Sequence, residues 1–188
     1  MAEDLRAVDV CHVPGPVLPL KADLDPETAA LVQRTGLNAF YGQFGHAPEL
    51  IAGWMSFYQP LVNGGRVELR TKELCRLRVA ARNGCLFCLG GRFRGPDGEP
   101  VVTDDDVDAV LSGRLDDPRF APREQAGLAW TETFRLDHSQ VDAALMGRTL
   151  EHFSEAEFLE LAVSVAQFTG MGQLFAVLGI PSPVPSPA

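Results

Sequence analysis

The sequence has few cysteines, a deficit of positive charge and no long apolar run. Only four of its 188 residues are cysteine, too few for the disulfide framework of a small secreted protein. Acidic residues outnumber Lys and Arg by 25 to 16, so the formal net charge is −9. Nucleic acids and anionic membranes need clustered cationic side chains, and we therefore expect neither as a partner.

The first residues do not have the composition of a secretory signal. The opening segment MAEDLRAVDV carries acids where a signal peptide is cationic, and no apolar segment follows it. Glycine or charged residues interrupt the longest apolar stretches, so no transmembrane helix is predicted. We expect a cytoplasmic protein, in a compartment where thiols stay reduced.

Helix signals dominate the chain, and strand signals are nearly absent. Asp25-Pro26 predicts the start of a helix that runs to about Tyr41, because Asp is a good N-cap and Pro fits the first turn. Pro48 opens a second, amphipathic helix. Further helix starts are predicted at Thr71, Thr103, Pro122, Ser139 and Ser154. The pattern predicts an all-α bundle of about eight helices.

Three regions are expected along the chain. Residues 1–20 are proline-rich near their end and form an extended arm, residues 21–181 form one helical domain, and residues 182–188 form a disordered Pro/Ser tail. Within the last helix, Gly170 and Gly172 indicate close approach of another helix.

Cys85 and Cys88 form the most informative local feature, a C-x-x-C pair. Asn83-Gly84 is expected to end one helix, which leaves Cys85 in the first turn of the next and Cys88 on the same face. The unpaired N–H groups and the dipole at a helix start favour a thiolate there. Such a position commonly lowers a thiol pKa from about 8.5 towards 7, so the pair is suited to redox chemistry.

Two other interpretations of the pair stay open. The cysteines could be small buried apolar residues, or they could be half of a zinc site. A tetrahedral zinc site needs four ligands, and no second C-x-x-C or H-x₃-H is present, although Cys11 and His12 could in principle complete a site. We favour redox thiols and expect neither a metal nor an organic cofactor.

The cysteine pair belongs to a longer set of motifs. Glu73 precedes Cys85 by eleven intervening residues, giving Glu-x₁₁-Cys-x-x-Cys. Related segments are H-x-P-E-L at 46–50, L-R-T-K-E-L at 69–74, L-R-V-A-x-x-N-G-C at 77–85, P-R-F-A-P-R-E at 118–124, H-F-S-E-A-E at 152–157 and L-G-I-P at 178–181. Over roughly residues 20 to 181 the chain resembles the carboxymuconolactone decarboxylase and alkylhydroperoxidase D superfamily.

The resemblance implies a helical fold that assembles as a homo-oligomer, usually a dimer, trimer or hexamer. It also implies a thiol-dependent, antioxidant peroxidase that acts on a small hydroperoxide. Cys88 would attack the peroxide, Cys85 would resolve the sulfenic acid to a disulfide, and Glu73 would be the acid–base group of a proton relay. An external thiol reductant protein would restore the dithiol.

Arg92 is a departure from the peroxidase pattern. Peroxidase members usually carry a His at this position, four residues after the second cysteine, and Arg cannot accept a proton. His46, just before a helix, is the candidate replacement base. Two other functions stay open: a decarboxylase or lactone-processing enzyme that acts on a carboxylated lactone, and a non-catalytic redox sensor.

Overall fold

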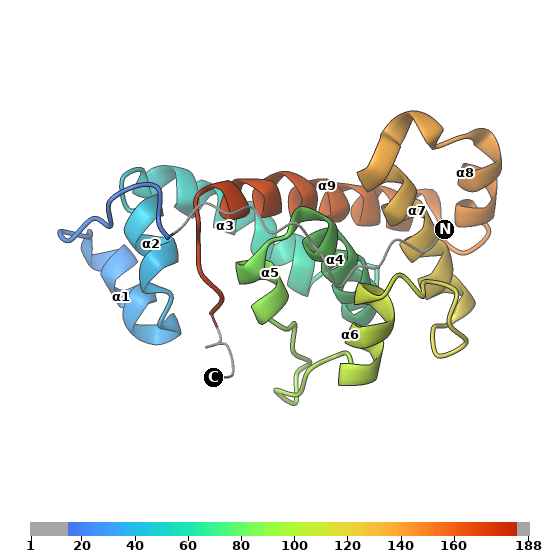
Figure 1. Cartoon of the computed structure of the whole chain (residues 1–188), viewed down its shortest axis with the longest axis horizontal. Helices are drawn as coiled ribbons and strands as arrows, with labels where there is room; N and C mark the ends of the chain where they lie inside the picture. The colour runs from blue at the N-terminus through green and yellow to red at the C-terminus, as the bar shows by residue number, and fades with distance from the viewer. Residues whose placement is uncertain (1–14, 184–188) are drawn as a thin grey trace.

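The computed structural model describes residues 15–183, whose regular secondary structure is helical apart from one isolated β-bridge between Arg94 and Pro100 (Figure 1). The all-α prediction is confirmed. Cys11 and His12, the zinc ligands considered above, lie outside the described residues, as do residues 184–188 of the predicted tail. None of the described helices combines the length and the apolar character needed to cross a membrane.

Most of the helices are joined by short connections, and the longer ones are residues 91–103 and 112–121 on either side of α6. The helix bounds are α1 Pro26–Thr35, α2 Asn38–Phe44, α3 Pro48–Asn63, α4 Leu69–Asn83, α5 Leu86–Gly90, α6 Asp104–Leu111, α7 Pro122–Asp137, α8 Ala143–Leu150 and α9 Glu155–Val177. In Figure 1, α9 and α3 run along the long axis, α1 and α2 lie at one end, and α7 and α8 lie at the other. Helix α4 packs against α5, α6, α7 and α9 and is the centre of the bundle.

Several predicted helix starts are confirmed by their capping contacts. The Asp25 side chain accepts hydrogen bonds from the backbone N–H groups of Glu27 and Thr28 at the start of α1. Capping boxes form at the start of α6, between Thr103 and Asp106, and at the start of α9. These contacts satisfy backbone donors that no intrahelical carbonyl reaches.

Three predicted boundaries are wrong. The helix expected to run to Tyr41 breaks at Gly36, whose φ of 71° puts it in the left-handed region that ends α1. Thr71 does not cap α4, because the helix begins at Leu69. Ser139 lies in a short 3₁₀ turn, and Asp142 caps α8 instead by accepting from Leu145 N at 2.7 Å.

Helix α4 is buried on nearly every side, so its charged side chains need partners. Lys72 is fully buried and pairs with Glu160 at 2.6 Å, while Arg78 pairs with Glu132 at 2.6 Å. Burying a charge without such a partner costs roughly several kcal/mol of folding free energy. These pairs hold α4 in one orientation against α7 and α9.

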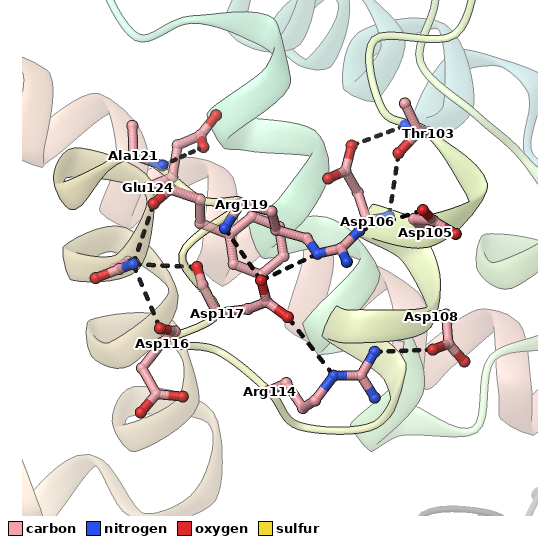
Figure 2. Close-up of polar contacts among 12 residues, drawn as sticks. Thr103, Asp105, Asp106, Asp108, Arg114, Asp116, Asp117, Arg119, Ala121 and Glu124 are labelled. Atoms are coloured by element: carbon pink, nitrogen blue, oxygen red, sulfur yellow. Dashed lines mark hydrogen bonds and ion pairs between the residues drawn. The ribbon is translucent and has the colours of Figure 1, made fainter.

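Polar contacts also hold the N-terminal half of α4 to α6 and α7. Arg70 on α4 donates to Asp106 at 2.7 Å and to Glu124 at 2.8 Å. Asp106 belongs to the capping box of α6, and Glu124 accepts from Ala121 N at the start of α7 (Figure 2). The connection between these two helices is closed by further Asp–Arg contacts around Asp117 (Figure 2). This network anchors the helix that carries Glu73.

Helix α9 approaches the end of α4 closely at Gly172. A Cβ built there would lie 2.7 Å from Asn83 Nδ2 and 3.7 Å from Cys88 Sγ. The Asn83 side chain cannot move freely, because it donates to the Thr169 carbonyl at 3.1 Å and accepts from Arg135 at 2.8 Å. The predicted close approach is confirmed at Gly172. It is wrong at Gly170, where an added Cβ meets no described atom within 4 Å.

This difference gives a matched pair of substitutions. We expect Gly172→Ala to lower the free energy of unfolding by about 1–3 kcal/mol through overpacking. Gly170→Ala should raise it by up to about 1 kcal/mol, because Ala is the better helix former. Urea denaturation followed by circular dichroism measures both, and equal effects of the two variants would contradict the packing described here.

Candidate active site

Cys85 lies at the junction of α4 and α5 and is completely buried. Gly84 adopts a left-handed conformation, with φ of 60°, which ends α4 and turns the chain so that Cys85 becomes the N-cap of α5. Its Sγ accepts a hydrogen bond from Cys88 N at 3.2 Å. The predicted first-turn position is therefore wrong by one residue, but the thiol does receive a backbone N–H at a helix start.

Cys88 is the member of the pair that reaches open space. Its side chain is partly exposed and lines a cavity of about 290 Å³, whose lining does not include Cys85. Both thiols are free, as is Cys75, which is buried in the main core. A small molecule that enters the cavity would therefore meet Cys88 first.

The wall of the cavity is mainly apolar and rich in aromatic side chains. Phe87 of α5 stacks on Phe40 of α2 with ring centroids 5.4 Å apart, and Phe175 of α9 meets both rings edge-on. The polar side chains among the residues that line the cavity are Tyr41, Trp54, Tyr58, Arg76, Cys88, Arg92 and Gln167. An apolar wall with a few polar groups is typical of small-molecule sites.

Arg76 connects the cysteine pair to the core of α4. Its guanidinium donates to both carboxylate oxygens of Glu73, at 2.6 and 2.8 Å, and to the carbonyl oxygens of Cys88 and Gly91, the latter at 2.9 Å. It also lies over the Phe93 ring, with Cζ 5.0 Å from the ring centroid. Burial alone would lower the pKa of Arg76, but the hydrogen bonds and charge of Glu73 raise it, so the group stays cationic. The arrangement brings one fixed positive charge next to the thiols.

Glu73 is fully buried, and both of its carboxylate oxygens accept hydrogen bonds from neighbouring residues. Besides the two bonds from Arg76, its Oε1 accepts from Phe93 N at 3.2 Å. Glu73 is not among the described residues that line the cavity. The structure thus places Glu73 near the pair, as the spacing predicted, with Arg76 hydrogen-bonded both to it and to the Cys88 backbone.

The two sulfur atoms divide the charge unequally. A hydrogen bond from the Cys88 thiol lowers the pKa of Cys85 below its usual range, against the effect of burial, and Arg76 lowers this pKa further. The same hydrogen bond, together with burial, raises the pKa of Cys88. Because the pair shares one proton, its titration belongs to both residues together. When the reduced pair loses its first proton, the negative charge therefore falls mainly on Cys85.

Arg92, which replaces the usual relay His, and His46, the candidate replacement base, both contact backbone carbonyls. Arg92 lines the cavity, and its Nη1 donates to the carbonyls of Leu89 and Gly91 at 2.6 and 2.7 Å. The exposed His46 ring has Nε2 2.8 Å from the Pro19 carbonyl oxygen and is not among the described residues that line the cavity. The structure brings Glu73, Cys85 and Cys88 together without His46.

Two residues of the site were missed in the sequence. Arg76 was not singled out from the sequence, although it follows Glu73 by one helical turn, a spacing that favours an ion pair. Tyr58 was not singled out either, and its side chain lines the cavity. Burial raises the pKa of Tyr58, so its hydroxyl keeps its proton. Among residues 15–183, no group of three or more His, Cys, Asp or Glu could hold a metal ion.

Comparison with known proteins supports the resemblance. The family model described as the carboxymuconolactone decarboxylase family matches residues 48–133, from the start of α3 into α7, a segment that contains Glu73, Arg76 and both cysteines. The uncharacterized protein YdfG of Bacillus subtilis (strain 168) is 26% identical over 110 residues, which cover 58% of this chain and 74% of YdfG. The predicted family resemblance is confirmed at the level of this match: residues 48–133 are similar to the carboxymuconolactone decarboxylase family.

The shared proton predicts how the pair titrates. In a Cys11→Ser background, the reduced pair should lose its first proton at a pH below the usual cysteine value of about 8.5, so the thiolate disappears only as the pH falls through that lower midpoint. Cys88→Ala removes the donor, so burial should move the Cys85 midpoint upward, whereas the hydroxyl of Cys88→Ser keeps part of the effect. Ultraviolet absorbance of the thiolate measures this. A midpoint in Cys88→Ala at or below that of the parent would contradict the assignment.

Proposed function

We propose that the chain is a thiol-dependent peroxidase that cycles Cys85 and Cys88 between dithiol and disulfide. One arrangement supports the proposal above all: two free thiols lie together at the start of α5, and one of them lines a cavity beside a buried guanidinium. Reactive thiols need a stabilised thiolate together with access for the oxidant, and the pair divides these two requirements between its members.

The different burial of the two sulfurs sets their roles. Cys88 lines the cavity and is the attacking residue, while the fully buried Cys85 is the resolving residue. Since the pKa of Cys85 is lowered and that of Cys88 is raised, the first thiolate forms on Cys85, and its sulfur can take the proton of Cys88 as that residue attacks. The peroxidatic and resolving roles are those that the family resemblance implies.

The proposed cycle balances atoms and electrons. The Cys88 sulfur attacks one peroxide oxygen, the O–O bond breaks, and Cys88 becomes a sulfenic acid while the alkoxide takes a proton and leaves as an alcohol. The Cys85 sulfur then attacks the Cys88 sulfur and gives up the proton it took from Cys88, the S–S bond forms, the S–OH bond breaks, and the hydroxide leaves as water with that proton. The two thiols thus supply both electrons. An external dithiol reductant restores the pair by exchange.

Proton delivery to the alkoxide is assigned to Tyr58. Its protonated hydroxyl belongs to a residue of the cavity wall, and its electrostatic coupling to Cys88 and Arg76 supports proximity to the reacting sulfur. Glu73 is assigned the role of holding Arg76, because both of its oxygens accept from that guanidinium. His46 has no part in this cycle, since its ring contacts the Pro19 carbonyl.

Treatment of the reduced protein with one equivalent of hydroperoxide tests the proposal. We expect mass spectrometry to show a Cys85–Cys88 disulfide, a stable Cys88 sulfenic acid in Cys85→Ser, and no oxidation of Cys85 at a comparable rate in Cys88→Ser. Cys75 is an internal control, because burial raises its pKa to about 12 and it should stay unmodified. Absence of the disulfide, or rapid oxidation of Cys85 without Cys88, would refute the proposed cycle.

The same assay separates Tyr58 from a merely structural residue. Tyr58→Phe should slow peroxide reduction by about 100-fold, the lower end of general acid catalysis. Alkylation of Cys88 by iodoacetamide should keep its rate, because the departing iodide needs no proton. Equal slowing of both reactions would assign Tyr58 to cavity shape instead.

A further inference from the structure

Arg92 lines the cavity without an acidic partner among the described residues. Its Nη1 donates to two backbone carbonyls, those of Leu89 and Gly91, and neither contact neutralises its charge. Arg76, the other guanidinium of the wall, is compensated by the buried carboxylate of Glu73. The described part of the cavity wall therefore carries one guanidinium that forms no direct ion pair with a described carboxylate.

This charge lies in unfavourable surroundings. Burial and the neighbouring charge of Arg76 lower the pKa of Arg92, and the smaller opposing effects of the Glu73 and Asp104 carboxylates do not offset them. A partly buried cation in an otherwise aromatic cavity is stabilised by any anion that can form charge-assisted hydrogen bonds to it. Only Nη1 is engaged by described residues, which leaves the remaining N–H groups of the guanidinium for a ligand.

The rest of the wall restricts the shape of such a ligand. Phe40, Phe87 and Phe175 form a connected aromatic cluster on one side, and Trp54 and Met55 also line the cavity. A volume of about 290 Å³ is at the small end of ligand pockets, which commonly span about 300–1,000 Å³. A compact apolar body, such as a single aromatic ring, suits this space better than a long acyl chain.

We propose that the cavity selects a compact organic hydroperoxide that also carries a carboxylate. The apolar body lies against the aromatic cluster, the carboxylate pairs with Arg92, and the hydroperoxide oxygen reaches Cys88. The hydroperoxide part of this inference rests on the proposed function, whereas the carboxylate part does not. Arg92 would thus confer substrate specificity at the position where the peroxidase pattern has a proton-transferring His.

Binding can be tested without turnover by using unreactive alcohols. The probes are 4-(2-hydroxypropan-2-yl)benzoate and its methyl ester, measured by calorimetry against the reduced protein at low salt. We expect the acid to bind about tenfold more tightly than the ester. Arg92→Gln should abolish this preference, and Arg92→Lys should restore part of it.

Arg94→Gln is the matched control, because Arg94 is exposed and is not among the described residues of the cavity wall. It should leave the preference unchanged. Comparison of acid and ester within one variant also cancels any change in cavity shape caused by loss of the Arg92 contacts to α5. Equal affinities for acid and ester in the parent protein, no binding of either, or a preference that survives Arg92→Gln would overturn the inference.

The corresponding hydroperoxides separate this inference from the proposed function. If cumene hydroperoxide and its 4-carboxylate both form the Cys85–Cys88 disulfide at equal rates, the carboxylate specificity is refuted and the peroxidase proposal stands. If the unreactive acid binds through Arg92 but neither hydroperoxide oxidises the pair, the peroxidase proposal is refuted and the anion site stands. Faster disulfide formation with the carboxylate, lost in Arg92→Gln, supports both.

Discussion

The buried ion pair of Glu73 and Arg76 is the interaction on which the site depends. Both residues come from α4, yet the guanidinium extends beyond that helix and donates to the carbonyls of Cys88 and Gly91. Removal of one member of such a pair leaves an uncompensated buried charge, at a cost of about 3–5 kcal/mol. The short α5 has only five residues and little stability of its own, so its position is set by this anchor and by packing.

The ion pair also shapes the chemistry of the thiols. It holds a cation beside two sulfurs that share a proton, and that cation favours their ionised state. Since Cys85 stays inside the protein and Cys88 lines the cavity, the proposed cycle places the negative charge and the attack on different sulfur atoms. Arg92 adds a second cation to the cavity wall. In the proposed site, this cation recognises the charge of the substrate, while Cys88 reacts with its hydroperoxide group.

Local signals in the sequence predicted much of the fold. Asp25-Pro26, Thr103 with Asp106 and Ser154 with Glu157 are read correctly because capping depends on residues only two or three positions apart. The break at Gly36 was missed because the apolar pattern continues across it, and a glycine within a helical pattern does not by itself specify a left-handed residue. Ser139 was wrongly predicted as the cap of α8 because it lies in a 3₁₀ turn, which places Asp142 at the N-cap position instead.

Less of the site than of the fold could be predicted from the sequence, because the contacts of the site join segments far apart in the chain. The Glu73–cysteine spacing correctly brought those residues into one region, but it could not reveal that Arg76 occupies both carboxylate oxygens. Similarly, the position of His46 before α3 gave no indication that its ring contacts Pro19. The cavity lining of Tyr58 and Arg92 depends on packing among α3, α5 and α9, which no local pattern encodes.

The most direct test of this account removes the ion pair without leaving a lone buried charge. Glu73→Gln combined with Arg76→Gln is compared with Lys72→Gln combined with Glu160→Gln, which removes a second ion pair of α4. The measured quantity is the pH midpoint of disulfide formation by one equivalent of peroxide, with circular dichroism to confirm folding. We predict that the first double variant raises the midpoint by about one unit, equivalent to about 1.4 kcal/mol, and that the second leaves it unchanged. An unchanged midpoint in a folded Glu73→Gln/Arg76→Gln protein would contradict the account.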